Sequence, residues 1–138
     1  MRTYDRNSVL VVDDNHIFRE SLAQKLRDAG YQVATAETGE KAFVALRDWS
    51  HPVGWLYTRA NLPGLIDGWI LADAYRDSHS DRAVIIAAPE ARSSRQGDIV
   101  LKQPVLSAVL DLLRQGIDAE RSKLAPDQAD MADRRRAA

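Results

Sequence analysis

Apolar strand patterns and amphipathic helix patterns alternate along most of this chain of 138 residues. The first strand pattern is VLVV, a β-branched and aliphatic run that is typical of a strand buried on both faces. The strands are predicted at residues 9–12, 31–36, 53–58, 83–88 and 99–101, and the helices at residues 17–29, 37–49, 67–77 and 105–115. Parallel strands need a crossover, normally a right-handed helix, so the alternation predicts a parallel sheet covered on both faces.

The order of these elements predicts an α/β protein with a doubly wound, five-stranded parallel sheet in the flavodoxin-like order 2-1-3-4-5. Residues 89–98, PEARSSRQGD, are polar, contain Pro and Gly and carry no apolar stripe. The fourth crossover helix is therefore predicted to be shortened or missing. In such a sheet, ligands bind at the carboxyl ends of the strands. The residues at those ends are Asp13, Asp14, Arg59, Ala87, Ala88 and Lys102.

The first predicted helix has one apolar face and ends at Gly30. The residues of the predicted buried face are Ile17, Leu22, Leu26 and Ala29. Arg19, Lys25 and Arg27 fall outside this face.

The composition fits one domain with a core of ordinary size, because 45% of the residues are hydrophobic. We predict an N-terminal arm at residues 1–7, the folded domain at residues 8–117, and a helix extension and flexible tail at residues 118–138. The formal net charge of -1 gives no reason to expect a nucleic-acid or membrane surface. With no cysteine, no signal-peptide pattern and no apolar stretch long enough to span a bilayer, we expect a soluble cytoplasmic protein.

Asp13 and Asp14 are adjacent carboxylates at the end of the first predicted strand. Two ionised carboxylates side by side are costly unless a cation or a basic side chain lies nearby, so the pair indicates a positive partner. Lys102, which follows the last predicted strand, would bring an ammonium group to the same cleft. Alternatively, one carboxylate caps the following helix, the other is solvated, and Lys102 is a solvated strand terminus.

Three sequence motifs together resemble the receiver domain of bacterial two-component response regulators. They are VLVVDDN, then NLPG followed by DGW, and a lysine near a proline before a final amphipathic helix. The resemblance covers about residues 8 to 116. The shortened fourth crossover and the extra residue in LPGLIDG are similar to a group of small stand-alone receivers.

The resemblance implies a phosphorylation site, from which this chain departs at the acceptor. In the family, an acidic pair after the first strand holds Mg²⁺, and an aspartate at the end of the third strand accepts a phosphoryl group from a histidine kinase. A lysine at the end of the fifth strand pairs with that group. Asp13 and Asp14 match the metal pair, and Lys102 matches the lysine. The acceptor stands four residues before a proline, and in TRANLP that position holds Arg59.

Three other positions depart from the family pattern. The Thr or Ser that closes the fourth strand aligns with Ala87 or with Ala88, of which Ala88 is the closer match. The Phe or Tyr that rotates on phosphorylation aligns with Ile99, and Gln103 separates the lysine from the proline that usually follows it in a cis peptide bond. The resemblance therefore implies a degenerate phosphorylation site, which comprises Arg59, Ala88, Ile99 and Lys102.

Arg59 offers a planar guanidinium that stays protonated and suits carboxylates. We expect an internal salt bridge from Arg59 to Asp13 and Asp14, with Mg²⁺ binding by the two aspartates weak or lost and no cofactor required. A charge pair about 4 Å apart at an effective dielectric near 20 is worth roughly 4 kcal/mol before desolvation is subtracted. The alternative is that Arg59 extends into solvent and the acidic pair keeps part of its affinity for metal.

The leading hypothesis is a stand-alone pseudo-receiver, which is not an enzyme and acts independently of phosphorylation by binding a partner protein. The partner would be a histidine kinase, another regulator or a second copy of the chain, contacted through the last helix and residues 89–98, with no nucleic acid or membrane involved. One alternative is a phosphorelay receiver that uses Asp13 or Asp14 as acceptor. Another is a small nucleotide- or flavin-binding protein, which the acidic, glycine-free loop VVDDNH disfavours.

Overall fold

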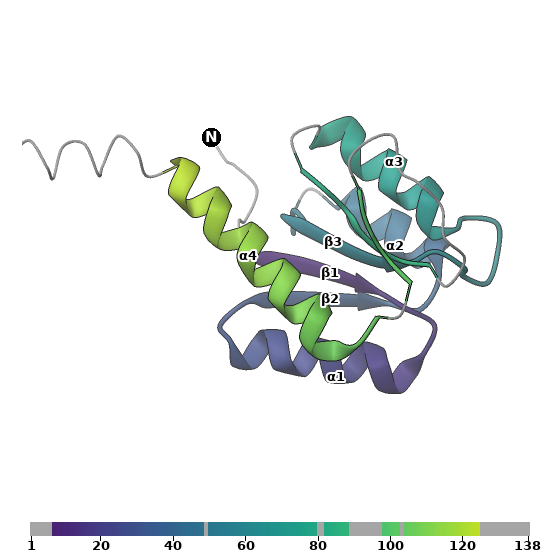
Figure 1. Ribbon diagram of the computed structural model, residues 1–138. Helices are drawn as coiled ribbons and strands as arrows, with labels where there is room; N and C mark the ends of the chain where they lie inside the picture. The colour runs from purple at the N-terminus through teal and green to yellow at the C-terminus, as the bar shows by residue number, and fades with distance from the viewer. Residues whose placement is uncertain (1–6, 49, 80–81, 89–97, 103, 125–138) are drawn as a thin grey trace, which may run out of the picture.

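A five-stranded parallel sheet in the order β2-β1-β3-β4-β5 forms the centre of the computed structural model (Figure 1). The structure describes residues 7–48, 50–79, 82–88, 98–102 and 104–124, the last five of them by backbone alone. The strands are β1 (Ser8–Val12), β2 (Gln32–Ala36), β3 (Trp55–Arg59), β4 (Ile85–Ala87) and β5 (Ile99–Leu101). The predicted flavodoxin-like α/β fold is thereby confirmed.

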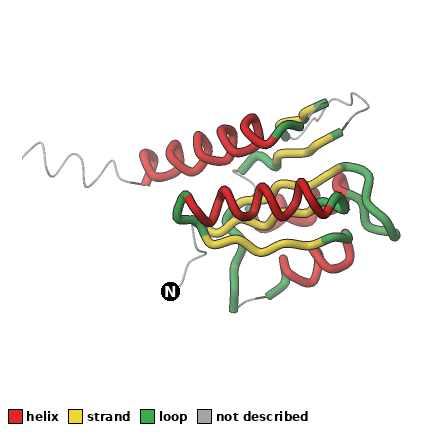
Figure 2. Tube along the Cα trace, turned by 90° about the horizontal axis from the view of Figure 1, so that it is seen from below, coloured by secondary structure: helices red, strands yellow, loops and turns green. Residues whose placement is uncertain are grey.

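Two helices cover each face of the sheet (Figures 1 and 2). The helices are α1 (His16–Asp28), α2 (Gly39–Leu46), α3 (Gly68–Ser78) and α4 (Leu106–Leu124). The pair α1 and α4 shares one face, and the pair α2 and α3 shares the other. In Figure 1, the C-terminal part of α4 extends beyond the strands of the sheet.

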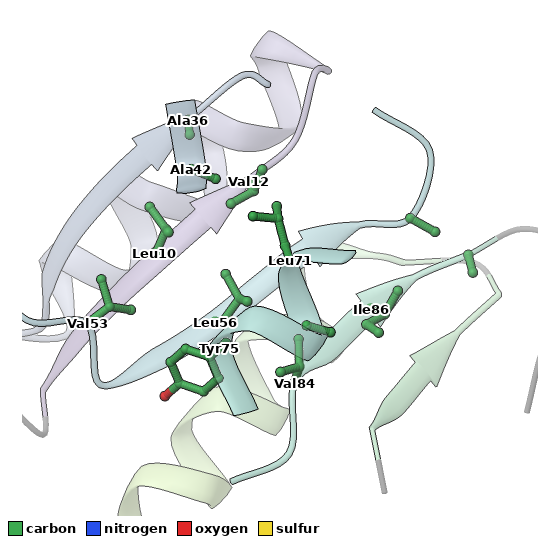
Figure 3. Packing of buried hydrophobic residues seen from close by; sticks show 13 residues of the cluster. Leu10, Val12, Ala36, Ala42, Val53, Leu56, Leu71, Tyr75, Val84 and Ile86 are labelled. Carbon is green, nitrogen blue, oxygen red and sulfur yellow. The ribbon is translucent and has the colours of Figure 1, made fainter. Parts of the chain in front are cut away.

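The apolar run of β1 supplies the core on both faces, because successive residues of a strand point to opposite sides. Val9 and Val11 belong to the cluster under α1 and α4. Leu10 and Val12 belong to the other cluster, which Figure 3 shows together with Leu71 of α3. A continuous apolar strand is therefore the expected sequence for the second position of this sheet.

Polar caps fix where the first three helices begin. Asn15, Thr38 and Asp67 precede α1, α2 and α3, and each side chain accepts a hydrogen bond from the backbone N–H three residues further on. Gly30, with φ of 97°, closes the turn after α1 as predicted. Because Asn15 begins α1 directly after the acidic pair, the cap also sets where those carboxylates stand.

The first turn of α1 differs from the predicted helical face. Ile17 is 76% exposed, and Ala29, which follows the helix, is also exposed, so the prediction that both are buried is wrong. Arg19 is buried instead, and Phe18 is half-buried. The cause is polar: Arg19 Nη1 donates a hydrogen bond to the carbonyl oxygen of Asp13 at 2.9 Å, a contact that apolar periodicity does not reveal.

The connection from β4 to β5 is anchored to α3 by a buried ion pair. Residues 89–97 lie outside the described residues, and none of the four helices in the described part of the chain stands between these two strands. Asp98, directly before β5, has a side chain that is 1% exposed and pairs with Arg76 of α3, which is 10% exposed. Arg76 Nη2 also lies 2.6 Å from the carboxylate of Asp73. The ion pair therefore holds the start of β5 against α3.

The predicted domain boundary falls inside a continuous helix, since α4 runs to Leu124. The predicted N-terminal arm, apart from Asn7, and the tail beyond α4 lie outside the described residues. Among the helices that are described, none is long and apolar enough to cross a membrane.

Removing the Asp98 carboxylate should destabilise the fold strongly. Asp98→Ala leaves the Arg76 guanidinium without its buried partner, and breaking a buried ion pair costs about 3 to 5 kcal/mol. Asp73→Ala removes the exposed partner of the same arginine and should cost less than about 1 kcal/mol. Urea denaturation measures both free energies of unfolding, and equal losses would contradict the anchoring role of Asp98.

Candidate functional site at the carboxyl ends of the strands

The register of the sheet brings a buried acid and an arginine to the same face. Asp13 directly follows β1, and Arg59 is the last residue of β3. Val11 is the register partner of Tyr57, so the side chains two residues further along each strand are neighbours as well. These side chains lie on the side of the sheet that α1 and α4 cover.

The Asp13 carboxylate is fully enclosed by hydrogen-bond donors. Its side chain has an exposed fraction of 0%. Oδ1 accepts hydrogen bonds from the backbone N–H of Asn15 at 2.8 Å and from Arg59 Nε at 2.9 Å. Oδ2 accepts a hydrogen bond from the hydroxyl of Tyr57 at 3.0 Å. Both oxygens of this buried carboxylate are therefore satisfied by the protein itself.

Arg59 pairs with both carboxylates of the acidic pair. Its Nε lies 2.9 Å from Asp13 Oδ1 and 3.5 Å from Asp14 Oδ1. The Arg59 side chain is 28% exposed and that of Asp14 is 46% exposed, so the ion pair with Asp14 is more solvated than the ion pair with the fully buried Asp13. The predicted salt bridge is present, and the alternative in which Arg59 extends into solvent is wrong.

A second arginine, Arg19, holds the backbone of Asp13. Each of its nitrogens has a partner: Nη1 donates to the Asp13 carbonyl oxygen at 2.9 Å, Nε lies 3.2 Å from Glu20 Oε2, and Nη2 lies 3.0 Å from His16 Nδ1. Since an arginine nitrogen can only donate, the His16 ring must accept at Nδ1. The sequence contained one signal for this role, because Arg19 lies in the first turn of a helix that follows the acidic pair.

Tyr57 is a site residue that the sequence analysis missed. Its side chain is buried, and its ring centroid lies 5.9 Å from that of Phe18. Burial, followed by the charge of the Asp13 carboxylate and the hydrogen bond to it, raises the pKa of the Tyr57 phenol above its usual range. The sequence did contain a signal for this role. Tyr57 stands two residues before Arg59, so both side chains point to the same face of the sheet, and a buried tyrosine hydroxyl requires a hydrogen-bond partner there.

The remaining predicted site residues lie at the same edge but make fewer contacts. Lys102 is exposed and, within the described residues, forms no ion pair with Asp13 or Asp14. Ala88 is buried after β4 and donates its N–H to Leu101 at 2.8 Å. Ala87 and Ile99 lie in β4 and β5. The described peptide bonds are all trans, and Gln103 is outside the described residues.

A divalent cation does not fit these residues. Mg²⁺ needs oxygen ligands in near-octahedral geometry, yet both oxygens of Asp13 already accept hydrogen bonds from protein groups. The Arg59 guanidinium also brings a positive charge to within 3.5 Å of both carboxylates. In the described part of the chain, no group of three or more His, Cys, Asp or Glu residues could hold a metal ion. The arginine therefore supplies the counter-charge that the acidic pair requires.

The fold and this acidic edge define a receiver domain, and the chain belongs to the response regulator receiver family. The family model described as "Response regulator receiver domain" matches residues 9–101. Such domains are signalling modules of two-component systems. A response regulator receiver protein from Anaeromyxobacter sp. (strain Fw109-5) is 33% identical over an alignment of 131 positions, which covers 90% of this chain and 54% of the relative. The chain thus spans about half the length of this curated relative.

Solved structures show the same fold at lower sequence identity. The response regulator receiver domain protein (CheY-like) from Methanospirillum hungatei JF-1 has a TM-score of 0.73 and 19% identity, over 85% of this chain and 98% of that chain. The response regulator receiver protein from Sinorhizobium medicae WSM419 has a TM-score of 0.72 and 21% identity, over 81% and 94% of the two chains. These likenesses establish the fold of this chain.

Replacing Arg59 by alanine should lower stability at neutral pH. Arg59→Ala leaves the buried Asp13 carboxylate without its counter-charge, and we expect a loss of about 2 kcal/mol, less than for a fully buried pair because 28% of the arginine side chain is exposed. Arg114→Ala, on the exposed side of α4, is the matched control and should change stability by less than about 0.5 kcal/mol. An unchanged melting temperature for Arg59→Ala would show that the salt bridge contributes nothing to stability.

The burial of Tyr57 predicts a loss of stability at alkaline pH. An unfolded tyrosine has a pKa of about 10, and the pKa of folded Tyr57 is raised, so above about pH 10 the unfolded state releases a proton that the folded state retains. The free energy of unfolding therefore falls as the pH rises above that value. Tyr57→Phe removes this group and should show a shallower fall. Urea denaturation across this pH range measures both slopes, and identical slopes would refute the prediction.

Proposed function

We propose that this receiver domain signals without aspartyl phosphorylation, as a pseudo-receiver that acts by binding a partner protein. The observation that supports the proposal is the place of Arg59, which ends β3, where the family resemblance puts the acceptor aspartate. Its guanidinium pairs with Asp13 at 2.9 Å and so occupies the centre of the acidic site.

The chemistry of the surrounding residues supports the same conclusion. A protonated guanidinium is a poor nucleophile, so Arg59 cannot take the role of an acceptor carboxylate. Ala87 and Ala88 carry no hydroxyl that could donate to a phosphoryl group. The Asp13 oxygens are already hydrogen-bonded, which leaves the site in one charge state that does not require Mg²⁺.

The partner is a histidine kinase, another regulator or a second copy of this chain. Receiver domains as a class interact with histidine kinases and other signalling proteins. Among the described residues, the exposed large apolar side chains include Ile17 at the start of α1 and Val105 directly before α4. Ile17 follows the acidic pair after β1, and Val105 follows β5, so both lie toward the carboxyl ends of the strands and offer apolar contact area to such a partner.

A phosphorelay through a different acceptor is the main alternative function. Asp13 is a poor candidate, because its side chain is 0% exposed and both of its oxygens accept hydrogen bonds. Asp14, with a side chain that is 46% exposed, is the accessible carboxylate. A phosphoryl group on Asp14 that disappears in Asp14→Asn would favour this alternative.

The experiment that tests the proposal is an amide NMR titration with Mg²⁺ and then with Mg²⁺ plus beryllofluoride, which imitates an aspartyl phosphate. We expect no shifts around Asp13, Asp14 and Lys102 in the natural chain, because the guanidinium repels the metal. Arg59→Asp replaces that cation by a third carboxylate and should gain saturable shifts with Mg²⁺. Saturable shifts in the natural chain would refute a phosphorylation-independent site.

A further inference from the structure

Among the described residues, Arg59 donates hydrogen bonds through one of its three nitrogens. Nε donates to Asp13 Oδ1, whereas Nη1 and Nη2 donate no hydrogen bond to any residue in the described chain. A guanidinium has five N–H donors in a rigid plane, and its terminal edge, formed by Nη1 and Nη2, faces away from the group bound at Nε by the geometry of the plane. The side chain is 28% exposed, whereas the Asp13 carboxylate that Nε contacts is 0% exposed, so we infer that the exposed part includes the terminal edge.

The surrounding contacts hold the Arg59 guanidinium in place before any ligand arrives. Its anchor, Asp13, is fully buried and is itself held by the Tyr57 hydroxyl and by Arg19 at the backbone carbonyl. An ordinary surface arginine must lose its rotamer freedom on binding, and that loss offsets much of the interaction. Arg114, exposed on α4 without a described polar partner, is such an arginine. Arg59 has already lost this freedom, so a ligand on its terminal edge binds at a smaller entropic cost.

The charges at this edge favour a planar monoanion. The negative charges of Asp13 and Asp14 are balanced by the positive charges of Arg59 and Lys102. The net charge of this edge is therefore close to zero and does not repel a monoanion. A carboxylate matches the two parallel N–H groups of a guanidinium edge. A dianionic phosphate experiences stronger repulsion from Asp14, whose half-exposed carboxylate lies 3.5 Å from Arg59 Nε.

We propose that the terminal edge of Arg59 is a preorganised docking point for the carboxylate of an Asp or Glu side chain on the partner protein. The inference rests on the proposed function, because a receiver that used this site for phosphoryl transfer would need the arginine displaced. It adds the chemistry of the contact: the partner presents an acidic residue to the place where other receivers carry their own acid.

The test is an NMR titration of the full chain in EDTA, which observes the arginine side-chain N–H signals. The probes are sodium acetate for a carboxylate, sodium phosphate for a phosphoryl group, and sodium chloride for ionic strength alone. We expect the Arg59 signals to shift saturably with acetate, at lower concentrations than with phosphate, while the Arg114 signals follow the chloride control. Arg59→Lys keeps the charge but loses the planar fork, and the acetate response of the neighbouring Ala60 amide should weaken about tenfold.

Two results would overturn the inference. If the Arg59 signals follow those of Arg114 or the chloride control, the terminal edge is not a binding site. If phosphate binds at lower concentration than acetate, the edge recognises phosphoryl groups rather than a partner carboxylate. Because EDTA removes Mg²⁺, neither result bears on the beryllofluoride titration. If that titration causes no shifts, the proposed function stands even when this inference fails.

Discussion

A carboxylate with no exposure to solvent, Asp13, is the feature on which the rest of the site depends. A buried, unpaired carboxylate would cost several kcal/mol, so the chain must surround it with donors. The donors come from different elements: the N–H of Asn15 at the start of α1, and the side chains of Tyr57 and Arg59 on β3. The same charge therefore fixes the side-chain geometry of β3 and the position where α1 begins.

The counter-charge of this carboxylate is part of the chain, which changes how such a site can respond. A bound metal exchanges with solution, and its occupancy follows its concentration. The Arg59 guanidinium cannot dissociate, and it stays protonated over the physiological pH range. Under the proposed function, the conformation of the acidic edge is then constant, and information must come from whether a partner is bound rather than from a change at the site.

Side-chain direction decided how much of this could be predicted from the sequence. The strands and the sheet order follow from apolar runs and their alternation with helices, and the Arg59 salt bridge follows because the carboxyl ends of adjacent parallel strands meet at one edge. Arg19 falls outside the predicted apolar face of α1, and its burial could not be predicted, because apolar periodicity does not reveal a buried arginine whose nitrogens all have polar partners. Tyr57 was treated as a strand residue, because an apolar run does not show which hydroxyl faces a buried acid.

The exposure of Lys102 follows from the same charge balance. Its place after β5 predicted an ammonium group directed at the acidic pair, yet the structure shows an exposed side chain without an ion pair to either described aspartate. Arg59 is closer, and its Nε hydrogen-bonds to Asp13, so a second cation would gain little attraction while losing hydration and rotamer freedom. Arg59 and Lys102 together balance the charges of Asp13 and Asp14, so the net charge of this edge does not repel one further anion, and the terminal edge of Arg59 is the group positioned to bind it.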